Sequence, residues 1–497
     1  MPKVIIIGSG FGGSIAALRF RQKGWDVSLN EMGEDWPSWK MQQTQDTRYL
    51  YRLFRDYPVD YYARTDTLRP KLVIAQGMGV GGGSLVYSGI HLRAPTEALE
   101  TYPVGFRRAD LDPYYARVET NLSVQTYLRS NGFDFLRRQV FAQGVANVGL
   151  GATQPNPLSF SNCTMCGWCV PNCIFDRKQS MALTYLARAK AWTGTGSIAI
   201  WSNWKATSVR KNGTGYRVYF LYTGDRRDNY HLVNSGTEVY EDCDRVVIAC
   251  GAIESPALLQ RSMPYLNGFA TSGEIGRAID GQGDGIVGGV MPDTRPTDTF
   301  KGAIMMDHVP VNVWNASTGR YEPQYVLEDI HSIPAGVGVK FPASFPSTGN
   351  TTWGLPFKQK TRNFAKKMLG IAIMGKSPSG GNITVNNDNG VAVASTSAYA
   401  LPTGSVDKAR SIITSLGGEV AHTPYEREGM IATVHPTGGC CMGKVVSTYN
   451  LEVYSNAGLY VIDGSVLPTS TWRNPSHTIA AVAEKGLDNI LGAPPVP

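Results

Sequence analysis

The pattern of apolar and polar positions near the start of the chain predicts a strand–helix–strand unit. Residues 3–7 are almost all apolar and β-branched, which is typical of a parallel strand buried on both faces. A glycine-rich turn follows, then a helical pattern over residues 14–20 and a second strand over residues 26–30. The longest apolar runs have the length of a strand, whereas a spanning helix needs about 20 apolar residues. We therefore expect no transmembrane segment.

The turn between the first strand and the helix has the spacing G-x-G-x-x-G. Gly8 permits a tight turn, Gly10 lets the backbone approach a pyrophosphate, and Gly13 lets the helix lie close to the sheet. The N–H groups at the start of the helix would bind the phosphates. Glu31 stands at the position where an acid binds a ribose hydroxyl. Because this acid favours an unphosphorylated ribose, the motif predicts FAD or NAD rather than NADP.

A second glycine-rich stretch distinguishes these two cofactors. Residues 77–84 read Gly-Met-Gly-Val-Gly-Gly-Gly-Ser and follow a short apolar strand over residues 72–74. One interpretation is a flexible loop. The other is backbone lying against a flat ring system, where side chains would collide. Because NAD enzymes do not usually carry a second loop of this kind, the stretch favours FAD.

Composition and charge set limits on the class of protein. With 497 residues, of which 42% are apolar and 18% charged, the chain can form a sizeable core in more than one domain. The net charge of +7 includes no run of five basic residues, so nucleic-acid binding gains no support. No secretory leader precedes the first motif, and unless one has been removed we expect a cytoplasmic protein.

Four motifs resemble those of the glucose–methanol–choline oxidoreductases, particularly the cholesterol oxidase branch. They are the loop at 79–86, Gly-Ala-Ile-Glu-Ser-Pro at 251–256, His-Pro-Thr-Gly-Gly-Cys-Cys-Met-Gly at 435–443, and the block at 459–479 with Asn-Pro-Ser-His. Their order and spacing match the family from end to end. The resemblance implies an α/β protein, with a discontinuous Rossmann-like FAD-binding domain and an α+β substrate domain built on an antiparallel sheet.

The same resemblance implies domain boundaries and cofactor contacts. The FAD-binding domain would comprise residues 1–36, 190–280 and 445–497 with the flavin loop 72–95, and the substrate-binding domain residues 37–189 and 281–444. The residues implied to bind FAD are Gly8, Gly10, Phe11, Gly12, Gly13, Glu31, Gly79, Gly83, Ser84, Tyr87, Ile90, Ala206, Asp463, Gly464 and Ser476. Tyr87 stands where cholesterol oxidases usually have asparagine, a change that would alter flavin tuning or exclude bulky substrates.

Three side chains are candidates for the chemistry. An alcohol releases hydride more readily as its proton leaves, and histidine, with a pKa of about 6.5, suits the base. His435 matches the family's active-site histidine, and Asn474 matches its second active-site position. Asp329 has a spacing to Pro334 that resembles the isomerising glutamate of cholesterol oxidases, although a surface acid is an equal alternative. His477 is interpreted as a supporting or structural residue.

Cys163, Cys166, Cys169 and Cys173 have the spacing C-x₂-C-x₂-C-x₃-C. This spacing is similar to that of bacterial ferredoxins, which suggests iron–sulfur ligands. The alternative is buried thiols or one local disulfide. The run is not followed by proline, and no second run exists, which are both departures from the ferredoxin pattern.

The function predicted from these features is FAD-dependent oxidation of an alcohol to a carbonyl, with His435 as base. The expected partners are a small alcohol, of an apolar sterol- or terpenoid-like kind, and O₂ or another electron acceptor. Two alternatives remain: a dehydrogenase that passes electrons through a cluster on the four cysteines, and a family-derived flavoprotein without redox activity.

Overall fold

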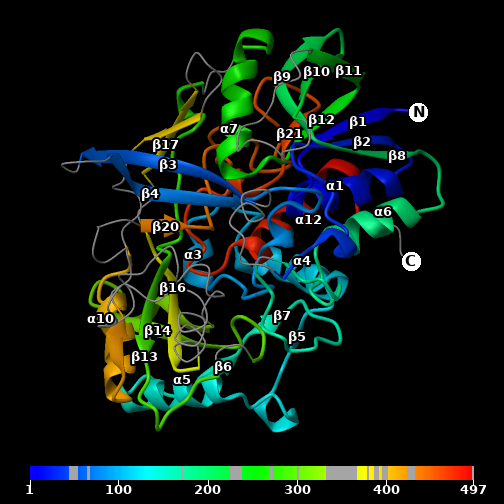
Figure 1. The fold of residues 1–497 in the computed structure, drawn as a ribbon. Helices are drawn as coiled ribbons and strands as arrows, with labels where there is room; N and C mark the ends of the chain where they lie inside the picture. The colour runs from blue at the N-terminus through cyan, green and yellow to red at the C-terminus, as the bar shows by residue number, and fades with distance from the viewer. Residues whose placement is uncertain are drawn as a thin grey trace.

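The computed structural model of the protein describes most of the chain (Figure 1). The described residues are 1–43, 54–63, 68–170, 172–223, 238–268, 272–298, 301–331, 366–377, 380–385, 391–394, 401–421 and 431–494. Two main sheets, one parallel and one antiparallel, lie in different parts of the molecule.

The parallel sheet has five strands in the order β21-β12-β1-β2-β8. Their bounds are Leu459–Val461, Arg245–Ile248, Lys3–Ile7, Asp26–Glu31 and Ile198–Ser202. Strands far apart in the sequence therefore pair side by side. The apolar run of β1 explains its central place, because Val4, Ile5 and Ile6 are fully buried. The helices α1 (Phe11–Gln22) and α12 (Ser476–Leu491) pack against each other beside this sheet (Figure 1).

A smaller antiparallel sheet packs beside the parallel sheet. Its strands are β9 (Trp204–Asn212), β10 (Gly215–Tyr222) and β11 (Glu238–Cys243). The helix α7 (Gly251–Ser262) follows β12 directly and packs on β9. Other elements among the described residues include α3 (Thr96–Leu99), α4 (Arg108–Asn121), α6 (Ala187–Ala191), β5 (Gln125–Thr126) and β7 (Pro157–Leu158).

The second main sheet is antiparallel and has the order β19-β13-β16-β15-β14-β6. The strand bounds are Glu419–Ala421, Gly285–Val290, Met368–Gly375, Arg320–Ile330, Asp307–Asn315 and Gln154–Pro155. The helices α5 (Leu136–Asn147) and α10 (Ser405–Ser415) cover one face and share a buried apolar core with it. Residues of the other face, such as Ala372 and Met374, face a cavity.

A mixed sheet connects the two parts, in the order β17-β18-β3-β4-β20. Its strands are Asn382–Val385, Val391–Ala394, Phe54–Ala63, Leu68–Gly77 and Ile431–Thr433. The strand β20 pairs parallel with β4, so that Thr433 lies opposite Ile74. Because parallel strands end at the same edge, the glycine loop after β4 and the segment after β20 emerge together. This pairing brings two distant motifs to one place.

The predicted fold class is confirmed: an α/β protein whose parallel nucleotide sheet is joined to a second part built on an antiparallel sheet. The strand over residues 3–7 is β1 itself, whereas the helix predicted at 14–20 begins earlier, at Phe11. The two glycines before residue 14 are helical because they lie in the first turn, where tight packing requires them. No helix among the described residues is long and apolar enough to cross a membrane.

Candidate active site

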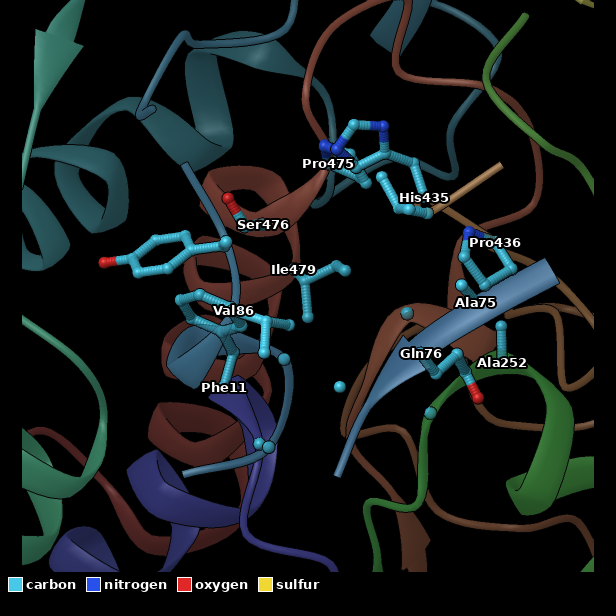
Figure 2. Close-up of a pocket in the computed structure, with 18 of the residues that line it drawn as sticks. Phe11, Ala75, Gln76, Val86, Ala252, His435, Pro436, Pro475, Ser476 and Ile479 are labelled. Carbon is cyan, nitrogen blue, oxygen red and sulfur yellow. The ribbon is translucent and has the colours of Figure 1, made fainter. Parts of the chain in front are cut away.

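A cavity of about 680 Å³ lies between the parallel and the antiparallel sheet. Its volume is within the range of cofactor and ligand sites. Figure 2 shows side chains from separate parts of the chain around it, including Phe11, Gln76, His435 and Ser476. One end is formed by the loops of the nucleotide sheet and the other by apolar side chains of the antiparallel sheet.

The glycines after β1 have different roles in the cavity wall. A Cβ on Gly12 would lie 1.7 Å from the carbonyl oxygen of Ile462, and one on Gly13 would lie 2.0 Å from that of Gly8. These two glycines therefore allow close packing of the backbone. Gly10 differs, because a Cβ there would meet nothing within 4 Å, and the residue faces the cavity. Gly10 caps α1, whose first N–H groups are available to an anion.

Glu31 lies at the carboxyl end of β2 and lines the cavity. Its Oε2 accepts hydrogen bonds from the backbone N–H of Ser9 at 3.1 Å and from the Ser9 hydroxyl at 2.7 Å. Gly33 N–H donates to Oε1 at 2.9 Å. Burial raises the pKa of this carboxyl, and the hydrogen bonds oppose the effect.

The flavin loop turns through residues that only glycine tolerates easily. Gly79, Gly81 and Gly82 have φ values of 132°, 111° and 54°. The Ser9 hydroxyl accepts a hydrogen bond from Gly81 N–H at 2.9 Å, which ties this loop to the nucleotide turn. A Cβ on Gly83 would meet nothing within 4 Å, so the backbone of Gly83 faces open cavity.

Most of the residues predicted to bind cofactor line this cavity. They are Gly8, Gly10, Phe11, Gly12, Glu31, Gly83, Tyr87, Ile90, Ala206, Asp463, Gly464 and Ser476. Gly13, Gly79 and Ser84 do not line it. The Ser84 hydroxyl instead donates to Gly81 O at 2.6 Å and accepts from Met181 N–H at 2.9 Å, so that it shapes the loop.

Tyr87, the residue that departs from the family pattern, has its hydroxyl group hydrogen-bonded within the protein. The hydroxyl donates to Gln179 O at 2.8 Å and shares a hydrogen bond with the Ser159 hydroxyl. The ring meets Phe11 edge-on, with 5.5 Å between the ring centroids. Burial raises the pKa of the phenol. The side chain therefore contributes an aromatic surface to the cavity rather than a charge.

His435 lies two residues after β20 and lines the cavity. Its Nδ1 is 2.8 Å from both carboxylate oxygens of Asp284. Because a carboxylate only accepts hydrogen bonds, Nδ1 carries the proton in the neutral imidazole and Nε2 is the acceptor. Burial lowers the pKa of His435, but the charge of Asp284, its hydrogen bond and the nearby Glu328 together raise it above 6.5.

Asn474 and Glu328 form the second polar group near His435. The amide of Asn474 donates to Glu328 Oε2 at 3.5 Å, and among the described residues the other oxygens of the two side chains have no hydrogen-bond partner. Burial raises the pKa of Glu328 from 4.5 to about 8, so that the carboxyl is mainly neutral at pH 7. Asn474 lines the cavity, so its unpartnered oxygen, supported by the neighbouring Glu328 carboxyl, is suited to meeting a polar group of a ligand.

Asp329 does not reach the cavity, which corrects the sequence prediction. Its Oδ2 accepts from Arg137 Nε at 2.9 Å, and its Oδ1 accepts from Met306 N–H and Asp307 N–H at 2.7 and 2.6 Å. Neighbouring residues of a strand point to opposite faces, so Glu328 faces the active site and Asp329 faces α5. Pro334, on which the prediction relied, lies outside the described residues.

Gln282 joins three segments of the site. Its Nε2 donates to the Thr437 hydroxyl at 2.7 Å, and its Oε1 accepts from Thr471 N–H at 2.7 Å and from the Thr471 hydroxyl at 2.9 Å. The residue is fully buried and has a φ of 60°. This hydrogen bonding places the segments that carry Asp284, His435 and Asn474 relative to one another.

His477 and the four cysteines of the run do not line the cavity. The ring nitrogens of His477 are 2.8 Å from His91 O and 3.3 Å from Tyr115 O, and the side chain is fully buried, as a structural histidine would be. The four cysteines at 163–173 are free thiols. Among the described residues, no three His, Cys, Asp or Glu side chains are grouped to hold a metal ion. The cluster-based alternative therefore gains no support.

Sequence reasoning missed Asp284 and Gln282, and it singled out Asp329 rather than its neighbour Glu328. Asp284 lies in Gly281-Gln282-Gly283-Asp284-Gly285, where the glycines signal an unusual turn. No local signal links this turn to His435, which is 151 residues away. The side of β15 that faces the cavity is likewise decided only by the packed sheet.

Comparison with known families decides the identity. The family model described as GMC oxidoreductase matches residues 4–277 with its N-terminal part and residues 406–483 with its C-terminal part. The chain belongs to the GMC oxidoreductase family. The cavity residues fit the FAD of that family, because the open glycines Gly10 and Gly83, the start of α1 and the acid Glu31 lie along one wall.

The relatives of this GMC oxidoreductase cover almost all of it. A cholesterol oxidase of Acinetobacter baumannii is 23% identical over 98% of this chain and 94% of its own length. One of Mycobacterium tuberculosis is 25% identical, with 97% and 90% covered. A long-chain-alcohol oxidase of Arabidopsis thaliana is 23% identical, with 96% and 67% covered.

Solved structures support the same fold. Pyridoxine 4-oxidase from Mesorbium loti superposes with a TM-score of 0.67 at 16% identity, and 98% of each chain is covered. A formate oxidase of Aspergillus oryzae gives 0.66 at 14% identity, again with 98% of each covered. This GMC oxidoreductase is thus an FAD-dependent enzyme of the alcohol-oxidising kind. A flavoprotein without redox activity finds no support in relatives named as oxidases.

Proposed function

We propose that this enzyme oxidises an apolar alcohol to a carbonyl compound, with His435 accepting the hydroxyl proton as hydride leaves the carbon. The observation that carries the proposal is the position of His435 on the cavity wall, with Nδ1 already bound to Asp284. Nε2 is then the basic nitrogen left for a ligand. A base whose pKa lies near the working pH is what this proton transfer requires.

Different residues of the chain have separate roles in the proposed reaction. FAD, when bound, would supply the acceptor for the hydride, and Gly10 and Gly83 are among the residues that would hold it. His435 takes the proton, so that the alcohol loses two electrons and two hydrogens in all. The buried amide of Asn474 and the mainly neutral Glu328 offer hydrogen bonds that orient the hydroxyl group.

The substrate class follows from the other end of the cavity. Apolar side chains dominate there, from β13, β16 and the segment before β14: Ile286, Val287, Ile304, Met305, Ala372 and Met374. Such a surface favours a hydrocarbon body over a sugar, whose hydroxyl groups would lose hydrogen bonds on burial. Cholesterol and long-chain alcohols, named as substrates of the relatives, are apolar alcohols. We propose a sterol- or terpenoid-like alcohol, with O₂ or another acceptor taking the electrons afterwards.

Anaerobic mixing with a panel of alcohols tests this function. Sterol, terpenoid and long-chain alcohols are expected to bleach the flavin absorption, whereas glucose and other sugars are not. Bleaching by sugars alone would overturn the substrate class. In His435→Gln, the bleaching rate is expected to fall on the order of a hundredfold or more, with FAD content retained.

His477→Gln is the matched control, because His477 is buried away from the cavity wall. This variant is expected to lose stability but to keep its bleaching rate within a few fold at a temperature where it is folded. If both histidine variants bleach at the wild-type rate, His435 is not the base.

A further inference from the structure

Asp284 is the charged group in closest contact with the reacting histidine. Resting on the proposed function, we propose that Asp284 is a positioning residue that holds His435 in one tautomer and one orientation. The proposal deepens the role of the site: the proton acceptor is a carboxylate–histidine pair, with Asp284 on Nδ1 and Nε2 facing the cavity.

The carboxylate of Asp284 is itself held in place by several donors. Its Oδ2 accepts from the Thr433 hydroxyl at 2.8 Å and from Val434 N–H at 3.2 Å, in addition to His435 Nδ1. His435 N–H donates to the same Thr433 hydroxyl oxygen at 3.0 Å. Both partners of the pair are thus tied to the end of β20, so their relative geometry is set by one short segment.

The turn that carries Asp284 is also rigidly placed. Gln282 and Gly283 have φ values of 60° and 59°, and Gln282 N–H donates to Asp280 Oδ1 at 2.6 Å. Asp280 exchanges backbone hydrogen bonds of 2.9 Å with Thr437, just beyond His435. A side chain at the end of such a turn has little freedom to leave its partner. This construction is expected of a group whose task is orientation.

The electrostatics of the pair agree with its geometry. Two acids face His435: Asp284, from the turn before β13, and Glu328, from β15, which Arg473 faces in turn. Burial alone lowers the pKa of His435, and Asp284 together with Glu328 more than reverses this effect, with Asp284 as the larger contributor of the two. When Nε2 takes a proton, the resulting imidazolium lies against the Asp284 carboxylate, which stabilises it. Asp284 therefore both fixes the orientation of the His435 ring and contributes to its basicity.

The direct test measures which nitrogen of the His435 ring carries the proton and at what pH the ring titrates. Neither quantity depends on enzyme turnover. In oxidised, FAD-loaded protein labelled with ¹⁵N-histidine, His435→Gln identifies the signal of that ring. The expected spectrum at high pH is that of the Nδ1–H tautomer, and the titration midpoint is expected above 6.5. A ring protonated at Nε2, or a midpoint at or below 6.5, overturns the proposal even if Asp284→Asn does not fold.

Asp284→Asn removes the charge with little change in shape. The midpoint of His435 is expected to fall by about one pH unit or more, because an opposite charge in contact shifts a pKa by roughly one to three units. Glu328→Gln is the matched control, since it removes the other acid that faces His435 without touching Nδ1. It is expected to shift the midpoint by less. Equal shifts would overturn the specific role of Asp284.

The pH profile of anaerobic flavin bleaching gives a second readout. Bleaching requires neutral His435, so the wild-type rate is expected to rise through the His435 pKa. In Asp284→Asn, this limb is expected to move to lower pH, and the plateau to fall roughly tenfold to a hundredfold. If the rising limb of the pH profile stays at the wild-type pH in a folded Asp284→Asn variant, the proposed Asp284–His435 pair is wrong. If His435→Gln itself bleaches normally, the proposed base fails, which is a separate result from failure of the pair.

Discussion

The two ends of the cavity are built from different kinds of groups. The end at the parallel sheet is built largely on backbone: glycine turns at Gly10 and Gly83 and the start of α1, with acids such as Glu31 and Asp463 beside them. The end at the antiparallel sheet consists of side chains brought from separate segments, with Asp284, Glu328 and His435 at its polar corner. Recognition by backbone can be encoded in a short motif, whereas a set of side chains depends on how distant strands pair.

The largest effect is expected from Gly12→Ala in the nucleotide turn. The added Cβ would lie 1.7 Å from Ile462 O, which the parallel sheet holds in place. The clash is expected to cost more than about 4 kcal/mol of the free energy of unfolding and to prevent FAD retention. Thermal unfolding and the ratio of flavin to protein absorbance measure both effects.

Gly10→Ala, two residues earlier, separates packing from cofactor contact. Its Cβ would meet no protein atom within 4 Å but would enter the cavity. Stability without FAD is expected to change by less than about 1 kcal/mol, while FAD binding weakens on the order of tenfold, or about 1.4 kcal/mol. If Gly12→Ala and Gly10→Ala change stability and FAD binding to the same extent, the distinction between a glycine that allows packing and one that faces the cofactor is wrong.

The next prediction concerns the end of the cavity at the antiparallel sheet, where the neighbouring acids Glu328 and Asp329 point to opposite faces of β15. Asp329→Asn removes the carboxylate that faces the buried Arg137. The free energy of unfolding is expected to fall by about 3–5 kcal/mol, the usual cost of breaking a buried ion pair. Urea denaturation measures it. At a temperature where the variant is folded, the rate of flavin bleaching is expected to remain near that of the wild type, and a specific loss of that rate would return Asp329 to the site.

A further effect, which depends on pH, is expected from Glu328→Gln. Folding raises the pKa of Glu328 from 4.5 to about 8, so between these values the folded protein holds a proton that the unfolded chain releases. The stabilisation is complete below pH 4.5 and is lost as pH rises through 8. Relative to Glu328→Gln, which does not titrate, wild-type stability is expected to fall by roughly 5 kcal/mol over this window, at about 1.4 kcal/mol for each pKa unit. Chemical denaturation at several pH values measures this difference. If the free energies of unfolding of the wild type and of Glu328→Gln change with pH in the same way, the raised pKa of Glu328 is wrong.

The sequence was most informative where function depends on local backbone. The turn from Gly8 to Gly13 and the strand before it were readable because tight turns, close packing and phosphate binding all require glycine at a fixed spacing. His435 was found through its motif. Asp284 was not, because acids in glycine-rich turns are common and nothing local identifies its partner. Asp329 was chosen over Glu328 because spacing along a chain does not say which side of a strand faces a cavity.

Taken alone, the sequence determined the nucleotide turn, the second glycine loop, the cofactor class and the identity of one histidine, since each of these depends on residues within a few positions of one another. Only the tertiary structure decided which acid meets that histidine, which acid is neutralised by Arg137, and which end of the cavity is apolar. These choices follow from the pairing of β4 with β20 and of β15 with its neighbours, and strand pairing is a long-range property of the folded chain.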